Sequence, residues 1–141
     1  RYQGYRDALH KFRIPFRKEL VILSQGMSFD DGMLAAKQII ELDNQVEAIF
    51  AFTDTVAIGA MNYLMDNGIK VPADIAVAGF SGTILSEVIR PSLTTVEQPL
   101  FEMGEVSARL LLEKINNRLT ECQTIVLDAE IKIRNSTEKM G

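Results

Sequence analysis

The sequence has one cysteine, one histidine and no tryptophan. The single cysteine, Cys122, excludes a disulfide within the chain and indicates a reducing, cytoplasmic compartment. The single histidine, His10, excludes histidine-rich metal sites and argues against a Ser-His-Asp mechanism. No apolar run approaches the roughly 18 residues that a membrane span requires. From these absences we expect no internal disulfide, no metal site and no membrane segment.

Charge of one sign is not in large excess either. The 15 basic and 19 acidic residues give a net charge of −4, and the basic residues are scattered. Because nucleic-acid binding usually needs a basic surface, we do not expect these residues to bind DNA or RNA directly. With 141 residues, 47% of them hydrophobic, the chain can form one soluble domain. It begins Arg1-Tyr2 without a start methionine or a signal segment, so we expect a fragment or a processed product.

Apolar runs and amphipathic segments alternate in the first 80 residues. Runs over 20–23, 48–52 and 75–80 predict short strands that are apolar on both faces. Helical spacing predicts a helix before the first strand and one in each interval between strands. An α-β-α-β-α-β order of this kind predicts an α/β fold, a parallel sheet with helices on both faces.

The second half of the chain adds further elements. We expect a short helix over 83–89, an extended segment over 93–96 and a long helix from Pro99 to about Arg118. Apolar and polar residues alternate strictly over 125–134, which predicts a strand with one wet face near a sheet edge.

Ligands of open α/β sheets bind beyond the carboxyl ends of the strands. Here those ends carry Thr53-Asp54 and Ser81, and the extended segment runs on to Gln98. Such short, mostly uncharged groups suit hydrogen bonding to a polyol, a base or an amide better than acid-base chemistry. Each also has a simpler structural role: Asp54 is most simply a helix N-cap, and the others can end a strand, a turn or a helix. Phe29 is either a stacking platform or, as we favour, a hydrophobic staple.

Signals for catalysis are weak. The chain has no P-loop, no GxGxxG that opens a helix after a strand, and no paired metal-ligand spacing. Gly79-Phe80-Ser81-Gly82 resembles a GxSxG nucleophile elbow, but its second glycine stands one residue too close to the serine. We therefore expect neither an enzyme nor a cofactor.

Four motifs extend over much of the chain: RxxGYxxAL at 1–9, AIFAFTDxxAxGA at 48–60, GxxVPxDIAVxGF at 68–80 and PxLTTVxQP at 91–99. In order and spacing they resemble the lactose-repressor family of bacterial transcription regulators. Sugar-binding periplasmic proteins share the fold and many of these residues. A sugar-binding protein of a transport system is therefore the alternative.

The resemblance implies a periplasmic-binding-protein-like type I core with two lobes. A full member of the family has a DNA-binding head and a hinge before this core, and the chain resembles its C-terminal fragment. Residues 1–97 and 129–141 would form the C-terminal lobe, and residues 98–128 would belong to the N-terminal lobe. Operator DNA would be reached only through a head that is absent from these residues.

The resemblance also implies ligand contacts. Arg1 matches an arginine whose forked donors suit vicinal hydroxyls or a carboxylate. Thr53 and Ser81 replace the asparagine and aspartate of the sugar binders. This argues against a neutral pentose bound in the same way and leaves open an acidic sugar or an oligosaccharide fragment. The expected ligand-binding residues are Arg1, Phe29, Thr53, Asp54, Ser81 and Gln98.

A dimer face is implied as well, on the helix after the second strand and the short segment after the third. Its expected residues are Ile58, Met61, Met65, Leu85, Val88 and Ile89. The alternative is that the helix is buried on two sides in a larger core. We therefore interpret the chain as the effector-binding and dimerisation part of an allosteric regulator whose effector is a sugar or a sugar acid.

Overall fold

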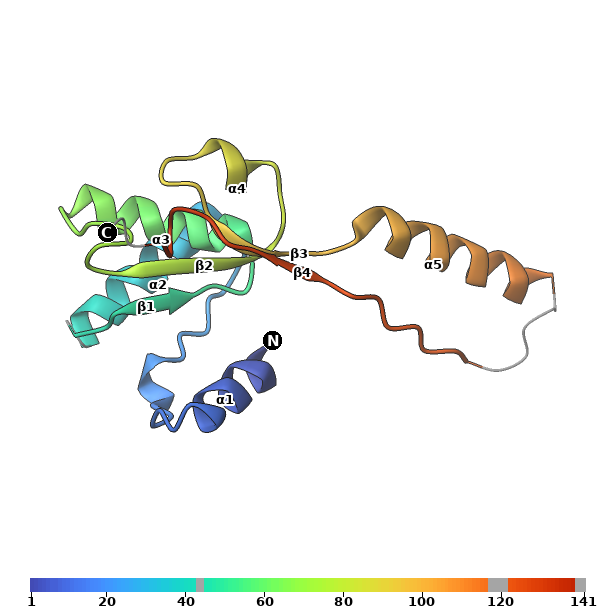
Figure 1. The fold of residues 1–141 in the computed structure, drawn as a ribbon, viewed down its shortest axis with the longest axis horizontal. Coiled ribbons are helices and arrows are strands. Elements are labelled where there is room, and N and C mark those ends of the chain that lie inside the picture. Colours follow the sequence, from blue (N-terminus) through green and yellow to red (C-terminus); the bar gives the residue numbers. More distant parts are fainter. Residues whose placement is uncertain (43–44, 117–121, 139–141) are drawn as a thin grey trace.

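The computed structural model describes residues 1–42, 45–116 and 122–138. Five α-helices, one 3-10 helix and four strands lie in these ranges (Figure 1). In chain order they are α1 (Tyr2–Lys11), η1 (Lys18–Leu20), α2 (Phe29–Leu42), β1 (Ala48–Phe50), α3 (Asp54–Asp66), β2 (Ala76–Ser81), α4 (Leu85–Val88), β3 (Thr94–Glu97), α5 (Leu100–Ile115) and β4 (Glu130–Lys132).

The strands form one sheet in the order β1-β2-β3-β4. The first three strands are parallel, and β4 pairs antiparallel with β3. The mostly parallel α/β sheet is thus confirmed, as is the position of the last strand at an edge. This last strand is shorter than the alternating segment 125–134, because its ladder extends only along Thr95–Glu97 of β3.

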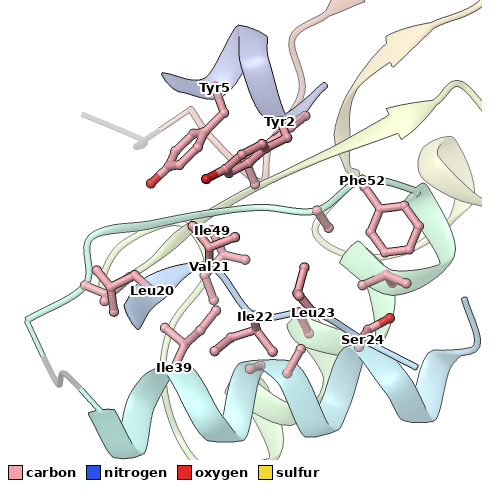
Figure 2. Close-up of a pocket in the computed structure, with 18 of the residues that line it drawn as sticks. Tyr2, Tyr5, Leu20, Val21, Ile22, Leu23, Ser24, Ile39, Ile49 and Phe52 are labelled. Carbon is pink, nitrogen blue, oxygen red and sulfur yellow. The ribbon is translucent and has the colours of Figure 1, made fainter. Parts of the chain in front are cut away.

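The predicted strand over 20–23 is wrong. Residues 18–20 form η1 instead, no strand pairing involves 21–23, and the Leu23 side chain is 88% exposed. A cavity separates this segment from β1 (Figure 2). Because a strand needs hydrogen bonds to a neighbour, an apolar run across a cavity from the sheet has no ladder to join.

The core lies between α3 and the sheet, with α2 packed against α3. The side of α3 that faces the sheet is apolar and buried, with Ala57, Ala60 and Leu64 on it. The two helices touch backbone to backbone near their first turns. A Cβ atom on Gly59 would lie 2.0 Å from the Phe29 carbonyl oxygen, so only glycine allows this approach. Gly32 of α2 approaches the Val56 carbonyl oxygen of α3 in the same way, since a Cβ atom there would lie 2.2 Å from it. The first turn of α2 is therefore fixed against α3.

Helix α5 extends away from the rest of the described chain (Figure 1), and none of its residues is buried. It ends at Ile115, and the predicted end near Arg118 lies outside the described residues. Large apolar side chains, including Phe101 and Leu112, are exposed along it. None of the described helices has both the length and the apolar character needed to cross a membrane.

Candidate functional site

The carboxyl ends of β1, β2 and β3 form one edge of the sheet, which we call the rim. It carries Thr53, Ser81 and Gln98, all partly exposed. Parallel pairing places the strand ends side by side, with Ser81 opposite Glu97 in the register. The Gln98 backbone N–H also points to the Ser81 carbonyl oxygen, 3.4 Å away. The structure thus brings these three predicted site residues together.

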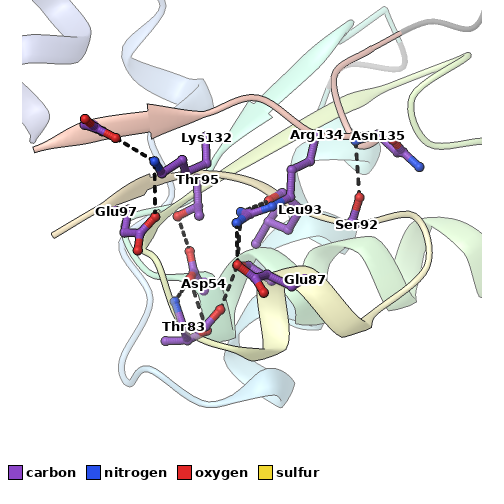
Figure 3. Close-up of polar contacts among 12 residues, drawn as sticks. Asp54, Thr83, Glu87, Ser92, Leu93, Thr95, Glu97, Lys132, Arg134 and Asn135 are labelled. Carbon is purple, nitrogen blue, oxygen red and sulfur yellow. Dashed lines mark hydrogen bonds and ion pairs between the residues drawn. The ribbon is translucent and has the colours of Figure 1, made fainter.

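Asp54 lies beneath the rim and not on it. Its side chain is fully buried, and its carboxylate accepts hydrogen bonds from the Thr83 N–H at 2.7 Å, the Thr83 hydroxyl and the Thr95 hydroxyl (Figure 3). The predicted N-cap role belongs instead to Thr53, whose hydroxyl oxygen accepts from the Val56 N–H at 3.3 Å. Asp54 therefore ties the start of α3 to β3 and to the loop after β2. Direct contact with a ligand would require these bonds to open.

Ser81 ends β2 with an unusual backbone conformation, a φ of +150°. L-residues rarely adopt positive φ, and such residues concentrate at functional sites. The neighbouring loop is held in place because Thr83 is bonded to Asp54 through both its N–H and its hydroxyl. Ser81 is thus presented at the rim by a fixed loop.

Arg1 reaches the rim from the opposite face of the sheet to α3. Its Cζ lies 4.0 Å from the centroid of the Phe80 ring, and its Nη1 donates to the Phe52 carbonyl oxygen at 3.0 Å. Its guanidinium therefore lies beside two strand ends. Phe80 is a contact that the sequence analysis missed, because the pattern marked it only as a strand residue.

Phe29 opens α2, and its side chain is partly exposed. The preceding Ser28 forms a capping box with Asp31: the Ser28 N–H donates to the carboxylate at 2.9 Å, and the Asp31 N–H donates to the Ser28 hydroxyl at 3.1 Å. The Ser28 hydroxyl also donates to the Asp31 carboxylate, and this bond, followed by the one from the Ser28 N–H, lowers the pKa of Asp31. The capping box and the Gly59 contact together fix the position of Phe29.

A cavity of about 650 Å³ lies between β1 and residues 20–24 (Figure 2). The residues of its wall that carry polar side-chain groups are Arg1, Tyr2, Tyr5, Lys18 and Ser24, but most of the lining is apolar. A polyol needs hydrogen-bond partners that converge on it, and a mostly apolar wall offers fewer of them than the rim. The cavity therefore fits a sugar less well than the rim does.

Charged side chains lie on the neighbouring strands β3 and β4. Lys132 on β4 lies 3.8 Å from the Glu97 carboxylate on β3 and also binds Glu130 (Figure 3). The hydrogen bond to Glu130 raises the pKa of Lys132 and lowers that of Glu130. In the part of the chain that the structure describes, no group of His, Cys, Asp or Glu side chains could hold a metal ion.

The predicted dimer face is only partly free. Ile58 and Met61 are 6% and 1% exposed and belong to the core, because this side of α3 packs against the sheet and α2. Both are therefore corrected to core residues. Met65, Leu85 and Val88 are exposed, whereas Ile89 packs against the core.

The family model of the periplasmic binding protein-like domain matches residues 1–137. The chain belongs to this family. Among curated relatives, it is 35% identical to the HTH-type transcriptional repressor PurR of Vibrio parahaemolyticus, over 100% of this chain and 42% of that protein. It is 34% identical to the catabolite control protein A of Priestia megaterium, over 96% of this chain and 41% of that protein. The chain thus spans about two-fifths of the length of these relatives.

Solved structures agree with this family. The transcriptional regulator CelR in complex with cellobiose superposes with a TM-score of 0.91 and 32% identity, over 96% of this chain and 41% of that one. A LacI family regulator from Enterococcus faecium with bound ribose superposes with a TM-score of 0.85 and 31% identity, over 96% of this chain and 50% of that one. The resemblance to the lactose-repressor family is confirmed, and the chain corresponds to a fragment of such proteins.

Proposed function

We propose that the chain forms the effector-binding part of a transcription regulator, and that its rim contacts a sugar or a sugar acid. The main support is the placement of Thr53, Ser81 and Gln98 side by side at the carboxyl ends of parallel strands, with Arg1 beside them. Arg1 and Gln98 offer donors to an effector, and the hydroxyls of Thr53 and Ser81 can donate or accept. Phe29 contributes an apolar surface at the start of α2.

The rim alone forms half of a cleft. We propose that residues 1–97 and 129–141 form the C-terminal lobe, and that residues 98–128 pack in an N-terminal lobe. Two observations support this division. Helix α5 exposes its apolar side chains. The strands that precede and follow it in the sequence, β3 and β4, run side by side where the chain would pass between the lobes (Figure 1). Effector would close the lobes on each other, and this change would be transmitted to a DNA-binding head outside these residues.

We further propose a homodimer that forms through the exposed apolar side chains of Met65, Leu85 and Val88, with Ile89 beneath them. We also propose that the protein is cytoplasmic and that it binds its effector without catalysing a reaction. The relatives are transcription regulators, which favours regulation over the alternative of transport. Operator DNA would be bound through the head and not by this acidic chain.

Isothermal titration calorimetry on the protein at its natural length tests this function. The panel is cellobiose, ribose, lactose and galacturonate, and Arg1→Met is titrated in parallel. We expect saturable binding of at least one sugar, and binding of that sugar that is about 10- to 150-fold weaker but still measurable in Arg1→Met. A panel without any binding, or binding that Arg1→Met leaves unchanged, would contradict the proposal. The Leu34→Met variant, which changes an exposed residue of α2, is the control.

A further inference from the structure

The Arg1 guanidinium is held by two contacts that leave donors unused. Its Cζ atom lies over the Phe80 ring, 4.0 Å from the ring centroid. Its Nη1 donates to the Phe52 carbonyl oxygen at 3.0 Å. A guanidinium carries five N–H donors in one plane, so a ring beneath it fixes the plane in which the others point. These two contacts therefore set the direction of the remaining N–H groups.

Phe80 is itself firmly placed. It lies on β2, an inner strand of the sheet, and stands opposite Val96 of β3 in the register. Its neighbour Gly79 faces α3, because a Cβ atom there would lie 2.6 Å from the Asp54 carboxylate. Successive side chains alternate across a sheet, so Phe80 faces the other side, where Arg1 lies. The ring is also adjacent in sequence to Ser81 on the rim.

Arg1 has no acidic partner in the described ranges, since none of the ion pairs there includes it. Asp54, the buried carboxylate of the site, is already bonded to Thr83 and Thr95. Within the described part of the chain, the Arg1 guanidinium thus contacts an aromatic ring and a carbonyl oxygen but no carboxylate. An effector that brings a carboxylate, or closely spaced hydroxyl oxygens, would supply the missing acceptor.

We propose that Phe80 is a positioning residue of the effector site, whose ring holds the Arg1 guanidinium in the orientation that an acidic or vicinal-hydroxyl group of the effector requires. This inference rests on the proposed function, in which Arg1 contacts the effector. Phe80 itself makes no contact with the effector and acts through Arg1. A ring without a formal charge suits this role, because it orients the guanidinium without competing for its donors as a carboxylate would.

The test uses the protein at its natural length, two variants of Phe80, and Arg1→Met with and without Phe80→Leu. Phe80→Leu removes the ring but keeps an apolar side chain, and Phe80→Tyr keeps the ring. If Phe80→Leu fails to fold, Phe80→Met replaces it. Galacturonate and cellobiose are titrated by calorimetry. Cation–π pairs contribute enough that Phe80→Leu should weaken binding of the tighter sugar by about 2- to 30-fold, while Phe80→Tyr restores it. With Arg1→Met as background, Phe80→Leu should change the affinity by less than about 2-fold.

A second readout does not depend on a sugar. Protons above an aromatic ring resonate upfield, so the Arg1 side-chain NMR signals should be shifted upfield in the free protein and return to ordinary positions in Phe80→Leu. Unshifted Arg1 signals in the unmodified protein would overturn the inference. Equal weakening by Phe80→Leu with and without Arg1 would also overturn it, because a merely structural role gives that result. If no sugar binds the unmodified protein, the proposed function fails, whereas the Arg1 signals still decide whether Phe80 orients Arg1.

Discussion

The hydroxyl of Thr95 on β3 donates a hydrogen bond to the buried carboxylate of Asp54 at the start of α3. The same carboxylate accepts two hydrogen bonds from Thr83, in the loop that follows β2 (Figure 3). One side chain thus joins the strand that leads to Gln98, the loop after Ser81 and the helix after Thr53. The geometry of the rim depends on this carboxylate.

Replacement of this carboxylate by a neutral amide should lower the stability of the folded protein. In Asp54→Asn, one oxygen becomes an NH2 group, which cannot accept the bonds that Thr83 or Thr95 donate. We expect the free energy of unfolding to fall by about 1–3 kcal/mol, measured by urea denaturation of the protein at its natural length. Asp66→Asn, at the exposed end of the same helix, should change it by less than about 0.5 kcal/mol. Equal effects of the two variants would contradict the structural role of Asp54.

The backbone contact between α2 and α3 predicts that a side chain at position 59 destabilises the fold. A methyl group at position 59 would lie 2.0 Å from the Phe29 carbonyl oxygen, so Gly59→Ala must push the helices apart. We expect a loss of about 1–3 kcal/mol in the free energy of unfolding. The control is Gly4→Ala in α1, where a methyl group meets nothing within 4 Å and should be neutral or stabilising. A stable Gly59→Ala variant would show that the helices are not in backbone contact.

The capping box of α2 predicts a dependence on pH. Hydrogen bonds from Ser28 lower the pKa of Asp31 below its ordinary value of 3.8. The charged form is thus favoured in the folded state, and its contribution to stability is complete above that ordinary value. It is lost as the pH falls through the lower folded pKa.

Asp31→Asn should therefore lower the melting temperature at pH 7, and the difference from the unmodified protein should shrink towards pH 3. Thermal unfolding followed by circular dichroism measures this. Asp30→Asn, on the same first turn, serves as the control and should show a smaller difference at pH 7. A difference that stays constant down to pH 3 would exclude the capping interaction as its cause.

The proposed dimer face makes a fourth prediction. Val88 on α4 is 59% exposed, so Val88→Glu should leave the fold intact and separate the subunits. The mass measured by sedimentation in solution should fall from that of a dimer to that of a monomer. Leu34→Glu on α2, which is 59% exposed as well, should remain dimeric. A Val88→Glu variant that stays dimeric would place the interface elsewhere. Ile58→Glu does not suit this test, because Ile58 is buried in the core.

Much of the fold could be predicted from the sequence because it depends on local periodicity. The buried face of α3 and the strands β1, β2 and β3 follow from the spacing of apolar residues. The segment 20–23 shows the limit of this signal, because an apolar run becomes a strand only where a neighbour is available for pairing. Apolar spacing likewise could not tell that Ile58 faces the core and not a partner subunit.

The site was harder to predict than the fold. The strand ends were visible as short polar pairs, so Thr53 and Ser81 could be placed on one rim. Asp54 is not the N-cap because its carboxylate is bonded to Thr95, which lies 41 residues after it in the chain. The sequence around Asp54 gives no sign of this bond. The contact between Arg1 and Phe80 joins residues 79 positions apart in the sequence, and no local pattern indicates it. Contacts of this range come from the tertiary structure.

A crystal structure of the protein at its natural length, with the tightest-binding sugar of the panel, tests the central claim most directly. We predict that the sugar lies against the rim, with Arg1, Ser81 and Gln98 within hydrogen-bond distance of its oxygens. A sugar found instead in the apolar cavity between β1 and residues 20–24, away from Ser81 and Gln98, would contradict the claim.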